Sequence, residues 1–425
     1  MPAPQRMSRT RRLQVLLLVS SLLIGCDILV PGLPADNAVL DAPLDGLLPE
    51  QLAVHLAGDE DFARRFSPAD GVGPTFNATS CDQCHVGEGK GHVMFNLTRF
   101  GRMGPDGFDP LREFGGPQLQ DRALPGFLPE QIPAAVTGAS AFMPPAVTGL
   151  GFLEAVDDAT LLALQDPDDA DGDGISGRVQ LVDASTVISE IADLETVVLG
   201  DGPTRGTLVD GQFIGRFGRK AGSINLLHQT VNALLQDMGL TTDLFPKDLL
   251  NRQTGNFAED GVADPEIPSG VVNALVFYLK TLRQPLRRNE TDPDVVAGDA
   301  LFGSIGCASC HLPTLRTGLS ELPQLSNVAF HPYTDLLLHD MGTELDDGYT
   351  EGRALTAEWR TTPLWGLGLS ADFQGGQAFF MHDGRALTLT DAIGLHGGEG
   401  AASRAAFQAL SAEDRDRVLA FLRSL

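Results

Sequence analysis

Two short stretches of the sequence share one arrangement of reactive side chains. The first, CDQCH, ends at His85, and the second, CASCH, ends at His311. Their thiols belong to Cys81 and Cys84 in the first stretch and to Cys307 and Cys310 in the second. This spacing is the attachment signature of c-type haem, in which each thiol adds across one vinyl group and the following imidazole binds the iron. Zinc would need four ligands, whereas each stretch offers three, so the sequence predicts two covalently bound haem c groups.

The remaining cysteine, Cys26, follows a segment that is typical of an export signal. Basic residues in MSRTRR precede the apolar run VLLLVSSLLIG, which is too short for a comfortable membrane span. The ending LIGC resembles the cleavage box of bacterial lipoproteins, whose cysteine carries the lipid. An ordinary signal peptide cut elsewhere, or a short membrane anchor, would fit the same pattern. We expect an exported protein that is anchored through Cys26 to a bacterial membrane and faces the periplasm.

Composition narrows the class of protein. The 425 residues carry a formal net charge of −26, whereas a protein that binds nucleic acid needs a basic surface. With 43% hydrophobic residues, the chain can bury a core and is not expected to be disordered as a whole. The acidic balance predicts that a docking partner presents a positive patch, and nucleic acid is not expected as a partner.

Each haem motif follows a segment that is predicted to form an apolar helix. Gly58-Asp59 and Gly298-Asp299 open comparable runs that carry a phenylalanine before the motif, as at the start of cytochrome c domains. The repeat predicts a mainly α fold with two cytochrome c-like haem domains, the first enlarged by a long irregular insertion. The expected boundaries are a signal peptide at 1–25, a tether at 26–49, and haem domains at 50–285 and 293–425.

Further segments carry a family resemblance that extends over residues 65–425. They include GGPQLQDRALPGF, PPAVTGLGFLEAV, IGRFGRKAG, DMGLT, EWRTTPLWGLG and MHDGRALTLTDAIGLHGGEG. The sequence resembles the di-haem oxidoreductases described as peroxidases or thiol oxidoreductases, relatives of bacterial di-haem cytochrome c peroxidase and of the di-haem enzyme of methylamine utilisation. The resemblance implies reduction of hydrogen peroxide with electrons from a small donor protein of the cytochrome c or cupredoxin type. A pure electron-transfer cytochrome, or an enzyme that oxidises the side chains of a partner protein, stays open.

The last of these segments suggests a second ligand for the C-terminal haem. His396 would share one face of a predicted helix with Leu389, Ala392 and Ile393. In the peroxidase relatives, the position fourteen residues after the HDG histidine carries the methionine that is the distal haem ligand, and here that position is His396. The resemblance thus implies that His311 and His396 bind the same iron, which would lower its reduction potential relative to a His–Met pair. An exposed or core-capping histidine is the alternative.

Reduction of peroxide also needs a group that moves a proton between the two oxygens. In the relatives a glutamate does this, and Glu154 has a comparable place in chain order, with apolar neighbours that would raise its pKa. A carboxylate at a helix start is the alternative. Gln118 and Arg122 are further catalytic candidates, for hydrogen bonding to peroxide and for stabilising the departing charge. The relatives carry a relay tryptophan in the N-terminal domain, whereas Trp359 and Trp365 both lie in the C-terminal half.

The distal ligand of the N-terminal haem is left open by the sequence. His92, Met94 and Met103 follow the first motif closely enough to be candidates. An iron with an open position can bind peroxide, whereas an iron with both axial positions filled only passes electrons. This difference separates the peroxidase from the electron-transfer cytochrome.

The segment DPDDADGDGISGR predicts a metal site of another kind. Asp169, Asp171 and Asp173 alternate in a tight loop and are followed by the carbonyl of Ile175, as in the calcium loop of an EF-hand. The twelfth position is Gln180 rather than a glutamate, so the usual closing ligand is missing. We predict a weak calcium site, with an acidic surface loop held by Asx turns as the alternative.

Overall fold

The computed structural model describes residues 35–104, 107–183 and 208–425. The predicted signal peptide and Cys26 therefore lie outside the described residues. The described residues from Leu40 to Leu425 belong to one compact unit, and those up to Val39 belong to another. In the part of the chain that the structure describes, no helix is both long and apolar enough to cross a membrane.

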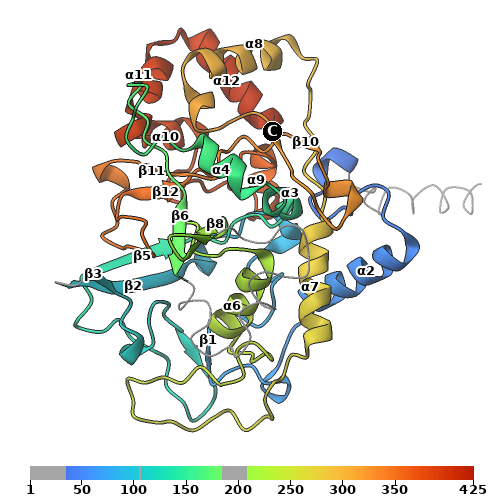
Figure 1. Ribbon diagram of the computed structural model, residues 1–425, viewed down its shortest axis with the longest axis vertical. Helices are drawn as coiled ribbons and strands as arrows, with labels where there is room; N and C mark the ends of the chain where they lie inside the picture. The colour runs from blue at the N-terminus through green and yellow to red at the C-terminus, as the bar shows by residue number, and fades with distance from the viewer. Residues whose placement is uncertain (1–34, 105–106, 184–207) are drawn as a thin grey trace, which may run out of the picture. The chain divides into compact units, whose positions relative to one another are not determined.

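Two crossing helix pairs carry the haem motifs (Figure 1). The pairs are α2 (Pro49–Ala63) with α7 (Ser269–Thr281), and α8 (Pro293–Ser304) with α12 (Ala412–Ser424). A glycine lies at each crossing, because a Cβ at Gly58 would come within 2.2 Å of the Ala274 oxygen, and one at Gly298 within 2.0 Å of the Arg417 oxygen. The Gly-Asp repeat seen in the sequence thus marks the two points where helix backbones touch.

The prediction of a mainly α fold is wrong. The described residues also contain five small antiparallel sheets of two or three strands. The strands are β1 (Thr75–Phe76) with β4 (Arg122–Ala123); β2 (Leu97–Gly104) with β3 (Gly107–Asp109) and β5 (Gly138–Phe142); β6 (Gln180–Asp183) and β7 (Leu208–Val209) with β8 (Gln212–Gly215); β9 (Leu315–Arg316) with β10 (Ala329–Phe330); and β11 (Leu338–Asp340) with β12 (Glu358–Arg360). Part of the expected irregular insertion is therefore sheet. Alternate residues of β5 are buried, which is the period of a strand and not of a helix.

The remaining α-helices are short except for one. They are α3 (Leu150–Glu154), α4 (Asp158–Leu164), α6 (Leu226–Met238), α9 (Ser370–Phe373), α10 (Leu389–Gly394) and α11 (Ala401–Ala409). The long one, α6, begins where the Asn225 side chain accepts a hydrogen bond from the His228 amide, and it ends at Gly239 in the left-handed conformation. These signals fix where α6 begins and ends.

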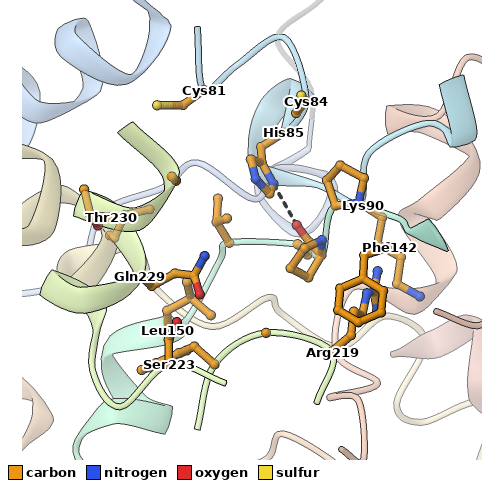
Figure 2. A pocket seen from close by; sticks show the side chains of 18 of the residues that line it. Cys81, Cys84, His85, Lys90, Phe142, Leu150, Arg219, Ser223, Gln229 and Thr230 are labelled. Carbon is orange, nitrogen blue, oxygen red and sulfur yellow. Dashed lines mark hydrogen bonds between the residues drawn. The ribbon is translucent and has the colours of Figure 1, made fainter. Parts of the chain in front are cut away.

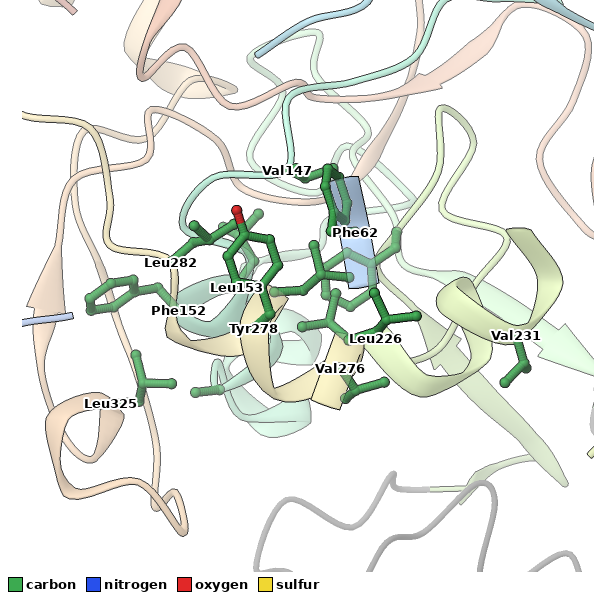
Figure 3. Close-up of a cluster of buried hydrophobic side chains, with 14 of the residues drawn as sticks. Phe62, Val147, Phe152, Leu153, Leu226, Val231, Val276, Tyr278, Leu282 and Leu325 are labelled. Carbon is green, nitrogen blue, oxygen red and sulfur yellow. The ribbon is translucent and has the colours of Figure 1, made fainter. Parts of the chain in front are cut away.

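Two buried apolar clusters follow the two helix pairs. The larger one joins α2, α6 and α7 through side chains that include Phe62, Leu226 and Tyr278 (Figure 3). The smaller one joins α8 and α12 through Phe302 and Phe421. Each haem motif is therefore attached to a helix whose inner face is fixed by its own core.

The segment IGRFGRKAG, which follows β8, ties distant parts of the chain together through buried cations. The Arg216 guanidinium forms an ion pair with Asp158 and donates to the carbonyls of Leu153 and Val156. The Lys220 ammonium donates to the carbonyls of Leu355, Thr356 and Glu358. A charged side chain that donates to backbone carbonyl oxygens forms strong hydrogen bonds, and these bonds hold the acceptor residues in fixed positions. The segment therefore links residues 153–158 to residues 355–358.

Candidate functional site

The first haem motif lines a cavity of about 230 Å³ (Figure 2). Cys81, Cys84 and His85 all contribute to its wall. The His85 amide donates to the Cys81 carbonyl over 3.0 Å, so the motif forms one turn that brings the thiols and the imidazole to the same space. Burial raises the pKa of each thiol to about 12, and these cysteines are therefore poor thiolate nucleophiles.

The His85 ring is held in one orientation. Its Nδ1 lies 2.8 Å from the carbonyl oxygen of Pro145 and donates to it, which leaves Nε2 as the unprotonated nitrogen. Phe62 of α2 packs near the ring, with centroids 6.3 Å apart. Burial lowers the pKa of His85 to about 4, although the Pro145 carbonyl opposes this shift. The imidazole is therefore neutral at pH 7, as an iron ligand must be.

The second motif repeats this arrangement in a separate cavity of about 200 Å³. The His311 Nδ1 donates to the Tyr333 carbonyl over 2.9 Å, and Phe302 of α8 lies with its ring centroid 6.4 Å from that of His311. Burial lowers the pKa of His311 to about 4. The two halves of the chain thus orient their motif histidines by the same device, a backbone carbonyl and a helix phenylalanine.

His396 also lines the second cavity. It follows α10, and its Nδ1 donates to the Ala392 carbonyl over 2.8 Å, which again leaves Nε2 free. The ring centroids of His311 and His396 are 6.4 Å apart. Two imidazoles on one iron have centroids about 6 Å apart, given a metal–nitrogen bond of about 2 Å and roughly 1.1 Å from each nitrogen to its ring centre. The spacing of these two histidines fits a single iron between them.

Buried cations line both cavities. Lys90 and Arg219 contribute to each, and Arg99 lines the first cavity with its Nε buried and without a hydrogen-bond partner among the described residues. Burial lowers the pKa of Lys90 to about 7 and that of Arg219 to about 9. Buried cations need anionic partners, and each haem carries two propionate carboxylates. The donor set therefore fits haem in its charge as well as in its sulfur and nitrogen ligands.

Comparison with protein families gives one match over residues 135–425, to the family described as "Di-haem oxidoreductase, putative peroxidase". The chain belongs to this family. The matched region contains the second haem motif, His396 and the Pro145 carbonyl that orients His85, whereas the first motif precedes it. Membership supports haem as the cofactor of this protein and a di-haem redox function.

Two solved structures that are similar to the chain share little sequence identity with it. Hydrazine synthase of Kuenenia stuttgartiensis, in a xenon-pressurised crystal, is 12% identical over 100% of both chains, with a TM-score of 0.37. A MauG-like protein associated with microbial copper homeostasis is 14% identical over 64% of this chain and 89% of that chain, with a TM-score of 0.29. No curated protein matches the chain.

The three predicted catalytic residues do not line either cavity. The Glu154 carboxylate lies 2.9 Å from the Lys280 ammonium and accepts a hydrogen bond from a backbone amide of α6. Arg122 is about half exposed, with 48% of its side-chain surface accessible. Gln118 is buried and donates over 2.7 Å to the carboxylate of Asp237, which does line the first cavity. A catalytic role for these residues stays a prediction, and Gln118 and Glu154 each contact a residue that lines the first cavity.

The three candidates for the distal ligand of the first haem also lie away from its cavity. Met94 and Met103 are 71% and 52% exposed, and the His92 Nδ1 accepts the Met94 amide. Among the described residues that line this cavity, His85 is the one histidine, and the two methionines are Met143 and Met238. The two cavities therefore differ, because two imidazoles face each other in only one of them.

The other histidines of the second cavity are held by carboxylates. His339 lies between Asp335 and Glu399, at 2.8 and 2.7 Å, and its Nδ1 is 3.7 Å from the Cys310 sulfur. Burial alone would lower the pKa of His339, but these hydrogen bonds outweigh it and raise the pKa to about 12. This histidine therefore adds a fixed positive charge at the edge of the second haem site.

Both tryptophans line a cavity, but different ones. Trp365 contributes to the first and Trp359 to the second. Trp359 stacks on His382 with centroids 3.6 Å apart and planes within 9°, and His382 is held by Asp347 over 2.7 Å. The chain therefore places an indole beside each haem site.

The loop predicted to bind calcium brings together a slightly different set of carboxylates. Ligand oxygens of Asp166, Asp169 and Asp171 lie within 4.8 Å of one another. The carboxylate of Asp173 instead accepts the amide of Ile175 over 2.8 Å. The sequence did not single out Asp166, which opens the loop.

Proposed function

We propose that this protein is a peroxidase-like di-haem enzyme that reduces hydrogen peroxide. Its haems would be attached through Cys81 and Cys84 and through Cys307 and Cys310, the former pair holding the site for peroxide. The observation that carries the proposal is the difference between the cavities. His311 and His396 would fill both axial positions of one iron, whereas His85 has no histidine opposite it.

Each residue of the sites has a defined task in this proposal. A bound haem supplies an iron that exchanges electrons and, where an axial position is free, binds peroxide. The neutral imidazoles of His85 and His311 are oriented by backbone carbonyls, so they need no rearrangement to act as ligands. Lys90 and Arg219 compensate the propionates of both cofactors. Since these cations line both cavities, the two cofactors would be close to each other along this wall.

We further infer that the protein is anchored to a bacterial membrane and works on the periplasmic side of that membrane. The lipoprotein-like signal ending at Cys26 supports export and lipid anchoring to the periplasmic side. The net charge of −26 favours a small donor protein, a cytochrome c or a cupredoxin, with a positive docking patch. Electrons would pass from that donor through the site of His311 and His396 to the site of His85.

Carbon monoxide separates this proposal from a pure electron-transfer cytochrome. The chain should be produced in a host that matures c-type cytochromes, and mass spectrometry should first establish two haems per polypeptide. We expect the fully reduced protein to bind one carbon monoxide per two haems and to be reoxidised by one equivalent of hydrogen peroxide. A reduced protein that binds no carbon monoxide and reacts slowly with peroxide would instead favour electron transfer without a substrate.

A further inference from the structure

One face of α6 forms a wall of the first cavity. Most of the cavity-lining residues of this helix are related by steps of three or four positions, and the full set is Leu226, Gln229, Thr230, Asn232, Ala233, Leu234, Asp237 and Met238. This is the spacing of residues on one side of an α-helix. The opposite side of α6 carries residues that do not line the cavity, such as Leu235. The helix therefore presents a defined set of side chains to the cofactor.

The α6 wall and the His85 wall are different walls of the same cavity. Figure 2 shows the Gln229 and Thr230 side chains entering from α6, whereas His85 enters beside Cys84 and points toward Pro145. The His85 ring orientation is fixed, and its Nε2 makes no hydrogen bond to any residue that the structure describes. A porphyrin held by Cys81, Cys84 and His85 would have its other face toward α6.

The residue in the middle of this helix face, Ala233, has a small side chain. Ala233 lies one helical turn, roughly 6 Å of rise, from both Gln229 and Asp237. Its methyl group cannot bind iron and fills little space, while the flanking amide and carboxylate can make hydrogen bonds. A small polar ligand beside Ala233 would therefore contact its methyl group and could form hydrogen bonds with Gln229 on one side and Asp237 on the other.

Two polar groups near Ala233, the Thr230 hydroxyl and the Asp237 carboxylate, can interact with a ligand in the cavity. The Thr230 hydroxyl is buried and has no hydrogen-bond partner among the described residues. The Asp237 carboxylate is fixed by the Gln118 amide over 2.7 Å. Burial raises the pKa of Asp237 to about 6, and the bond from Gln118 and the charge of Arg99 only partly oppose this. A carboxyl that titrates near neutral pH can both accept and return a proton.

We infer that this face of α6 is the substrate wall of the peroxide site, with Ala233 keeping the axial position open, Gln229 donating a hydrogen bond to peroxide and Asp237 transferring its proton. The identity of the substrate rests on the proposed function, whereas the position of the wall does not. Gln118 is then a positioning residue, because it holds Asp237 and does not line the cavity itself.

The reaction proposed for this wall is the two-electron reduction of hydrogen peroxide to water. Hydrogen peroxide takes up two electrons from the donor protein and two protons from water, and it gives two water molecules. Asp237 accepts the proton of the oxygen nearer the iron and delivers it to the farther oxygen, which leaves as water when the O–O bond breaks. The two protons from solvent and the two electrons would then convert the remaining oxygen to the second water molecule.

Placing an iron ligand at position 233 tests the wall without any turnover. In the holoprotein, Ala233→His should convert the high-spin iron signal of the wild type to a low-spin signal in absorption and EPR spectra, and Ala233→Met should do the same. Leu235→His, on the outer side of the same helix, is the matched control and should leave the spectra unchanged. Met238→Leu should also leave them unchanged, because in this proposal Met238 lines the cavity without binding the iron.

The outcomes are distinguishable. High-spin iron that persists in both well-folded Ala233 variants, with two haems retained, would overturn the α6 wall and leave the proposed function standing. A wild-type protein with only low-spin iron would overturn the proposed function itself, and conversion of Met238→Leu to high spin would identify Met238 as the cause.

Steady-state and pH measurements test the two polar residues. Asp237→Asn should lower the rate of peroxide reduction by about 100-fold or more, in the range of a lost general acid–base group. It should also abolish a rate increase centred near pH 6. Gln229→Leu should weaken the apparent affinity for peroxide by about 3- to 10-fold, as for one lost hydrogen bond, and leave that pH profile in place. Unchanged kinetics in both variants would refute their roles in catalysis.

Discussion

The crossing of α8 and α12 gives a quantitative test of how the second haem motif is held. A Cβ added at Gly298 would lie 2.0 Å from the Arg417 carbonyl oxygen, 2.6 Å from its carbonyl carbon and 2.9 Å from the Phe421 Cβ. These atoms belong to the backbone and core of α12 and cannot swing away, so the helices must move apart. Such overpacking costs about 1–3 kcal/mol, which exceeds the roughly 1 kcal/mol that alanine gains over glycine in a helix.

Gly303 in the same helix is the matched control, because a Cβ there meets nothing within 4 Å. We expect Gly298→Ala to lower the free energy of unfolding and Gly303→Ala to raise it by about 0.5–1 kcal/mol. The two variants should therefore differ by about 1–3 kcal/mol in urea unfolding of the holoprotein. Equal shifts of the same sign in the two variants would refute the close helix crossing.

Four further predictions concern the sites and the segments that support them. His396→Met should raise the reduction potential of one haem and leave the other unchanged in a spectroelectrochemical titration, since a thioether replaces an imidazole. Arg216→Leu should destabilise the protein by about 3–5 kcal/mol, because it leaves the buried Asp158 carboxylate without its cation; the midpoint of denaturation measures this. The rate of peroxide reduction should rise as the pH increases through about 6, where the raised pKa of Asp237 places the change from carboxylic acid to carboxylate base. Calcium should raise the melting temperature of the wild type but not of Asp171→Asn, and an equal effect in both would place any bound calcium elsewhere.

The haem sites were predictable because their chemistry is local. Two thiols and an imidazole within five residues suffice to recognise attachment, and the glycine and phenylalanine that precede each motif lie on one helix. His396 was predicted as a ligand from its interval of fourteen residues after the HDG histidine, the position of the distal methionine in the peroxidase relatives. Its spacing from His311 then agrees with a shared iron.

Residues whose role depends on long-range packing were not predictable in the same way. Glu154 was chosen by its order in the chain, but order does not fix distance, and the fold pairs it with Lys280. Gln229 and Asp237 lie on a helix whose length is visible in the sequence, but which face meets the haem depends on the packing of α2 and α7. The strands were missed because all but β2 are runs of two to five residues, in which the alternation of buried and exposed side chains is too short to be recognised in the sequence.

The central claim is that one iron has a free axial position and the other has two histidine ligands. Low-temperature EPR of the fully ferric holoprotein, loaded with two haems, tests it most directly. We predict one high-spin and one low-spin signal in equal amounts, with only the high-spin signal changing when cyanide is added. Two low-spin signals that cyanide does not alter would contradict this assignment.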